Sequence, residues 1–134
     1  RLAHTLGSRV LYQPEAVVTH DHRYSLAAYL ERERHLGGQS LELAKINPDC
    51  AHAVFGRDVR DPDFIRECSQ MCAQEQETCD ALAREIEELA GKPSHSVKDI
   101  KEVYQRFLPL KRHTWRQGLV EEAIRLGLVS KLAA

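Results

Sequence analysis

The sequence has little of several features that mark whole classes of protein. No apolar run approaches the roughly 20 residues that a membrane-spanning helix needs, so no transmembrane segment is expected. The 19 Lys and Arg residues are balanced by 20 Asp and Glu residues. Because general nucleic-acid binders carry a basic excess, no nucleic-acid partner is expected. No secretory leader is evident, so the 4 cysteines are expected to stay reduced in the cytoplasm.

An initiator methionine is also lacking. Arg1 and Leu2 open the sequence, and residues typical of β-strands follow at once. We therefore expect the chain to begin inside a longer protein, with an upstream element removed. The 134 residues, of which 43% are hydrophobic, suffice for one core with at most a small appendage.

The amino-terminal part combines short β-type runs with a helical pattern. Residues 9–12 and 16–19 are rich in β-branched or aromatic side chains and flank Pro14, which predicts two short strands or one bent strand. Residues 24–36 show a helical pattern of apolar side chains, and Gly37-Gly38 predicts the end of that helix.

A second short helix is predicted over residues 40–46, because Asn47-Pro48 does not continue a helix. Residues 48–61 have the composition of a connector. Val54 and Phe55 are expected to anchor this connector to the core.

Three helices are predicted in the carboxy-terminal part. Asp61-Pro62 is typical of a helix start, and this long helix extends to Ala90. Ser96 is expected to cap a second helix that ends or kinks at Pro109, and a third covers residues 110–126. The stripe of the long helix, interrupted only by Glu75, consists of Ile65, Cys68, Cys72, Glu75, Cys79, Leu82, Ile86 and Leu89. The apolar face of the second consists of Val97, Ile100, Val103, Tyr104, Phe107 and Leu108.

The predicted fold class is therefore mainly α, with short N-terminal β-strands followed by helices and a C-terminal antiparallel helical bundle. Charge supports the bundle. Residues 61–92 hold nine acidic and three basic side chains, whereas residues 98–134 hold eight basic and four acidic ones. This division favours packing of the two segments against each other beside an apolar seam. Two solvated faces with unrelated charge remain the alternative.

Three groups of residues have the types needed for a site, but simpler roles are favoured. Cys68 and Cys72 lie one helical turn apart, yet a structural zinc ion needs four ligands, so small apolar seam residues are the preferred interpretation. Asp61 and Asp63 resemble a cation-binding Asp-x-Asp, but capping of a helix start explains both. The segment 111–116, with Trp115 partly buried, is expected to be the basic flank that faces the acidic helix, rather than a phosphate site.

The segment 20–23 gathers titratable and charged groups between a predicted strand and a predicted helix, where sites are commonly built. His20 and His22 could ligate one metal ion, or His20 could have a neutral structural role. Spacing alone favours the structural role over the metal site.

A longer ordered pattern includes this segment. It runs from Arg1-Leu2 through Gly7-Ser8-Arg9-Val10-Leu11-Tyr12-x-Pro14-x-Ala16-Val17-Val18-x-His20-x-His22 to Ser25-Leu26-x-x-Tyr29-Leu30-x-Arg32-x-x-x-Leu36-Gly37. This run, about residues 1–48, resembles the C-terminal end of a family 2 glycosyltransferase catalytic domain of the GT-A type. Residues 49–134 carry no family motif and are similar only to the helical tails that often follow such domains.

The resemblance implies a fragment of a larger α/β enzyme that transfers a sugar, with inversion, from a nucleotide diphosphate sugar to a hydroxyl of a glycan or lipid-linked acceptor. It implies a divalent cation, Mg²⁺ or Mn²⁺, in the parent protein and none in the fragment alone. His20 matches the family's terminal histidine, which implies a role at the metal or diphosphate. His22 and Arg23 are weaker candidates for contacts to the nucleotide diphosphate. The main catalytic carboxylates would lie upstream of Arg1, so the isolated fragment is expected to be inactive.

A rival hypothesis makes the chain a helical module for protein–protein interaction or self-association, without catalysis. A weaker one is a metal-binding helical protein that uses His20, His22 and cysteines. The enzyme hypothesis places residues 1–48 in the catalytic domain and residues 49–134 in a helical tail. This tail could also join copies of the chain into a homo-oligomer. It also admits a peripheral location at the inner membrane face.

Overall fold

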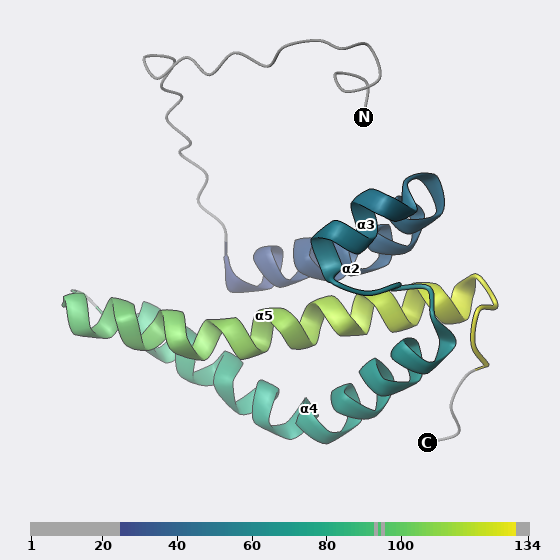
Figure 1. The fold of residues 1–134 in the computed structure, drawn as a ribbon. Coiled ribbons are helices and arrows are strands. Elements are labelled where there is room, and N and C mark those ends of the chain that lie inside the picture. Colours follow the sequence, from purple (N-terminus) through teal and green to yellow (C-terminus); the bar gives the residue numbers. More distant parts are fainter. Residues whose placement is uncertain (1–24, 93, 95, 131–134) are drawn as a thin grey trace, which may run out of the picture.

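The computed structural model describes residues 25–92, 94 and 96–130 of the chain. The predicted strands at 9–12 and 16–19 lie outside these residues. The described residues form helices α2 (Leu26–Ile46), α3 (Pro48–Phe55), α4 (Pro62–Ala90) and α5 (Val97–Arg125), as Figure 1 shows. The prediction of a mainly helical chain is confirmed for this described part, in which no strand occurs.

Helix α5 is the central element, because α2 and α4 each pack along it on different sides (Figure 1). Helix α4 runs antiparallel to α5: Glu75 pairs with Arg116 at 2.7 Å, and Glu85, further along α4, pairs with the earlier Arg106 at 3.3 Å. The predicted attraction between the acidic and basic segments is therefore confirmed by ion pairs.

Helix α2 runs parallel to α5. The predicted antiparallel bundle consisted of the C-terminal helices alone and did not include α2. The rings of Tyr29 and Phe107 meet edge to face, with their centroids 4.9 Å apart. One turn later on both helices, Lys111 Nζ lies 3.7 Å from an oxygen of Glu33. Contacts that advance in the same direction on both helices define the parallel orientation.

The predicted helix end at Gly37-Gly38 is wrong, because α2 continues through both glycines to Ile46. The reason is close packing. A Cβ atom on Gly37 would lie 2.0 Å from the backbone oxygen of Trp115, and one on Gly118 would lie 1.8 Å from that of Arg34. The two glycines let the backbones of α2 and α5 approach each other, and this contact outweighs the tendency of glycine to end a helix.

Pro109 neither ends α5 nor separates two helices, contrary to prediction, since α5 extends from Val97 to Arg125. A proline inside a helix removes one hydrogen bond and costs about 3 kcal/mol. Packing on both sides of the proline compensates: Phe107 contacts the core, and Leu110, 4% exposed, is part of it. The predicted cap is confirmed, with Ser96 and Asp99 forming a reciprocal capping box.

The segment predicted as a connector contains helix α3. Asn47 accepts a hydrogen bond from the Cys50 amide at 3.4 Å, so the Asn47-Pro48 pair that was expected only to end a helix also begins one. Phe55 anchors this part, as predicted, because its ring packs against Trp115 at 5.6 Å. Val54 does not, since it is 63% exposed.

The predicted start of α4 is confirmed: the Asp61 side chain accepts from the Asp63 amide at 2.9 Å. Buried side chains of the predicted stripe lie in two separate clusters. The first joins α2, α3, α4 and the end of α5, and the second joins α4 to the middle of α5. The clusters consist of Leu41, Ala44, Ala51, Val59, Ile65, Cys68, Leu119 and Ala123, and of Cys79, Ile86 and Leu110.

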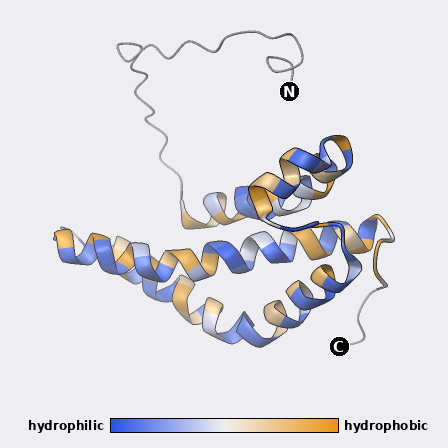
Figure 2. Cartoon of the chain, in the orientation of Figure 1, coloured by the Kyte–Doolittle hydropathy of each residue, from blue (hydrophilic) through white to orange (hydrophobic). Residues whose placement is uncertain are grey.

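The first turns of α5 include apolar residues (Figure 2), and several of these side chains are exposed to solvent. Val97, Ile100 and Tyr104 are 60 to 70% exposed, so only the later part of the predicted apolar face is covered. Leu26, the first residue of α2, and Val103 both pack against the cluster of Cys79, Ile86 and Leu110. No described helix is long and apolar enough to cross a bilayer.

The glycine contact yields a matched test within one dipeptide. Gly37→Ala should lower the free energy of unfolding by about 3 kcal/mol or more, because backbone atoms of α5 cannot yield to the new methyl group. Gly38→Ala is the control: its Cβ would lie 3.3 Å from Glu122 Cβ and 3.5 Å from the Gly118 backbone oxygen, so a small shift of the neighbouring atoms accommodates it, and alanine favours a helix by about 1 kcal/mol. Urea unfolding followed by circular dichroism measures both. Equal effects of the two substitutions would contradict the packing account.

Candidate metal centre between α4 and α5

A polar layer interrupts the apolar interior between the two clusters. Among the described residues, the buried polar or charged side chains are Glu33, Ser40, His113 and Thr114. Three of them have partners: Ser40 donates to the Gly37 carbonyl at 2.5 Å, Thr114 donates to the Leu110 carbonyl at 2.9 Å, and Glu33 lies 3.7 Å from Lys111 Nζ. Local hydrogen bonds therefore account for the hydroxyl groups.

His113 is the exception in this layer. Its side chain is 2% exposed, and neither ring nitrogen has a hydrogen-bond partner among the described residues. A buried polar group left without a partner costs about 1–3 kcal/mol. The imidazole therefore occupies a position where an apolar side chain of similar size would be more stable, unless something binds it.

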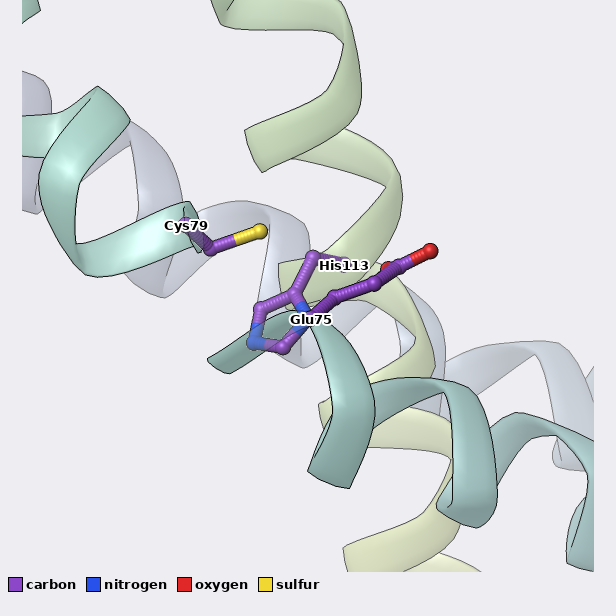
Figure 3. A group of neighbouring side chains, drawn as sticks. All are labelled: Glu75, Cys79 and His113. Atoms are coloured by element: carbon purple, nitrogen blue, oxygen red, sulfur yellow. The ribbon is translucent and has the colours of Figure 1, made fainter. Parts of the chain in front are cut away.

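Two side chains of α4 converge on this imidazole (Figure 3). Glu75 and Cys79 are four residues apart, so they lie on the same face of the helix. Ligand atoms of Glu75, Cys79 and His113 all lie within 4.8 Å of one another, with His113 Nδ1 3.7 Å from Glu75 Oε2. The antiparallel register of α4 on α5 creates this group of three.

The charge around the group is set by burial and by one cation. Arg116 Nη1 donates to Glu75 Oε2 at 2.7 Å and holds that carboxylate in place. Burial lowers the pKa of His113, although the neighbouring Glu75 carboxylate opposes the shift. Burial also raises the pKa of the Cys79 thiol, and the neighbouring Glu75 and Asp80 raise it further. Both shifts favour the uncharged forms of the imidazole and the thiol.

A cavity of about 270 Å³ adjoins the group between α2, α4 and α5, and Cys79 and His113 both line it. A chain of side-chain hydrogen bonds borders the same cavity. Arg34 donates to Gln117, Gln117 to Gln76 and Gln76 to Asp80, each at 3.0 Å. Solvent or a small ion thus has room next to the imidazole, at a place where all three long helices meet.

A larger cavity, about 560 Å³, lies beside the aromatic residues Phe55, Phe64 and Trp115. Three of its four lining cations pair with carboxylates: Arg57 with Glu67 at 3.1 Å, Lys111 with Glu33 and Arg116 with Glu75. The fourth, Arg112, is exposed. Among the residues that line this cavity, no buried side-chain nitrogen or oxygen lacks a hydrogen-bond partner, in contrast to His113.

The structure also bears on the residues that the sequence singled out. His20, His22 and Arg23 lie outside the described residues. Asp61 caps α4, as predicted, whereas Asp63 lies in the first turn and its carboxylate pairs with Arg66.

The basic flank at 111–116 is confirmed by the Arg116–Glu75 pair, and Trp115 is half-buried as predicted. Cys68 and Cys79 are 1% and 3% exposed, as expected of seam residues.

The group Glu75, Cys79 and His113 was not predicted. The long helix contains no histidine, and the partner comes from another helix 34 residues beyond Cys79 in the numbering of the chain. One sign was present in the sequence, because Glu75 interrupts an otherwise apolar stripe one turn from a cysteine. The sequence does not show that Glu75 lies near His113, because periodicity does not give the relative register of two helices.

No protein-family model, curated protein or solved structure matches this chain.

Burial of the thiols leads to a prediction about their reactivity. Burial raises the pKa of Cys68 and of Cys72 to about 11, whereas Cys50 is exposed. With a chelator present at pH 8, iodoacetamide should modify Cys50 at least about 100-fold faster than the thiols of α4, because thiolate is the reactive form. Peptide mapping by mass spectrometry measures each rate, and the same reaction in urea is the control. Rapid native modification of Cys79 would mean that the α4–α5 interface is open.

Proposed function

We propose that this chain is the C-terminal part of a family 2, GT-A-type glycosyltransferase and that its helices brace the end of the catalytic domain. The observation that carries the proposal is the ordered run of matching residues from Arg1 to Gly37. In this run, His20 follows directly after the second predicted strand. The proposed reaction moves a sugar from a nucleotide diphosphate donor to a hydroxyl of a glycan or lipid-linked acceptor. We place it in the cytoplasm or at the inner membrane face.

The roles of the residues follow from the chemistry of that reaction. A carboxylate base must take the proton of the acceptor hydroxyl, and Mg²⁺ or Mn²⁺ offsets the charge of the departing diphosphate. We assign both carboxylate motifs to the parent protein before Arg1. His20 would lie at the metal or diphosphate, and His22 and Arg23 would contact the diphosphate oxygens by charge-assisted hydrogen bonds.

The described helices support the bracing role. Ser25, the first matched residue in the described part, caps α2 by accepting from the Ala28 amide at 3.2 Å. Tyr29 packs on Phe107, and Gly37 makes the close backbone contact with α5. The last matched residues are thus joined to the tail in one core, so that the tail can hold the segment that follows His20 and His22.

A second candidate function is self-association through the tail. The exposed side chains of Val97, Ile100 and Tyr104 follow one face of α5 at helical spacing and favour it. A second copy of the chain is the proposed partner, because two such faces could cover each other by a symmetric contact.

The glycosyltransferase proposal is tested on the protein encoded by the whole reading frame. That frame should encode an Asp-x-Asp and an acidic pair before Arg1, and His20→Ala should lower kcat by at least about 100-fold, on the scale of one lost electrostatic group. The melting temperature should change little. His52→Ala, on the exposed surface of α3, is the matched control and should keep both quantities. Equal losses of activity and stability in His20→Ala would indicate a structural histidine.

Self-association has its own measurement. If the face of α5 joins two copies, light scattering after size exclusion should give twice the chain mass of 15.3 kDa, and Ile100→Lys should give the single mass. Lys98→Ala, an exposed position on a different face of α5, should leave the dimer intact. A single chain mass for the wild type at all concentrations would remove this candidate.

A further inference from the structure

We propose that Glu75, Cys79 and His113 form a binding site for a divalent transition metal ion, and that Zn²⁺ is the ion which best suits the three donors. This inference does not depend on the glycosyltransferase proposal, whose cation would lie near His20. It rests on the geometry between α4 and α5 (Figure 3).

The first argument is the unpartnered imidazole. His113 is 2% exposed and aims two unbonded ring nitrogens into the interior of the helix pair. Buried polar groups in proteins are almost always satisfied by protein, water or an ion. A metal ion bound to one nitrogen would supply the missing partner and would explain why this position holds a histidine.

The second argument is the chemistry of the donors. Zinc sites in proteins use cysteine sulfur, histidine nitrogen and carboxylate oxygen, and all three types meet here. Mg²⁺ and Ca²⁺ prefer oxygen donors, so a site with a thiolate and an imidazole selects against them. The mixed set therefore distinguishes the proposed ion from the cation of sugar transfer.

The third argument is the distance between donors. The ligand atoms lie within 4.8 Å of one another, whereas a tetrahedral zinc ion separates its donors by roughly 3.5 Å, given bonds of about 2.0–2.3 Å. Binding therefore requires rotation of the Glu75 and Cys79 side chains toward His113. The cavity lined by Cys79 and His113 gives a water molecule access to the fourth position.

Binding also has to balance charge. The Cys79 thiol must release its proton to solvent, after which one thiolate and one carboxylate neutralise the two positive charges of the ion. Arg116 opposes binding, because its guanidinium already holds Glu75 Oε2 at 2.7 Å. Removal of this cation should therefore strengthen binding, an effect that a purely structural role of the three residues would not produce.

The test uses the full chain, stripped with a chelator and titrated with Zn²⁺ against a chromophoric competitor. The wild type should bind one ion per chain and release about one proton. Cys79→Ser and His113→Gln should each weaken binding by more than the roughly 10- to 100-fold that loss of an outer-shell partner costs. Arg116→Met should bind more tightly than the wild type. The exposed residues supply matched controls, Cys50→Ser and His52→Gln, which should bind as the wild type does.

Two further readouts separate the site from its alternatives. Co²⁺ should give a thiolate-to-metal charge-transfer band in the wild type that Cys79→Ser abolishes, even if His113→Gln fails to fold. Zn²⁺ should raise the melting temperature of the wild type and leave that of Cys79→Ser unchanged. Absence of stoichiometric binding, binding that survives Cys79→Ser, or binding that disappears only when His20 and His22 are both replaced by Ala would overturn the proposal.

Discussion

The structure depends most on the close contact between the backbones of α2 and α5. Gly37 and Gly118 face the partner helix reciprocally, each at a place where a Cβ atom would overlap a backbone oxygen. A contact between two backbones cannot be adjusted by a change of rotamer, so it fixes the register of the helices far more strictly than side-chain packing does. That register brings the ring of Tyr29 to Phe107 and the carboxylate of Glu33 to Lys111.

Helix α5 is basic and shares its charges between two neighbours. Arg106 and Arg116 pair with acidic residues of α4, and Lys111 turns toward Glu33 of α2. Surface ion pairs contribute little to stability, typically 0–1 kcal/mol. Their distribution on two sides of α5 instead disfavours other orientations of the acidic helix, while the apolar clusters and the glycine contact supply the attraction.

The sequence predicted features that depend on near neighbours in the chain. The caps at Asp61 and Ser96 and the buried stripe of α4 follow from local chemistry and a helical period, and the structure has them. The errors at Gly37-Gly38 and Pro109 have one cause: residues that usually end helices are tolerated where another helix compensates. Likewise, the candidate metal centre joins residues of two helices, and only their relative register places His113 beside Glu75 and Cys79. Periodicity identifies faces, but it does not say which turn of one helix faces which turn of another.

The glycine contact and the candidate metal centre lie on different sides of α5, and a chain of hydrogen bonds runs from the first to the cavity beside the second. Arg34, whose carbonyl faces Gly118, donates to Gln117, and Gln117 donates to Gln76 of α4. These side chains border the cavity that His113 and Cys79 line. The placement of α2 therefore determines which polar groups surround the cavity. A shift of α2 along α5 would break the hydrogen bond between Arg34 and Gln117.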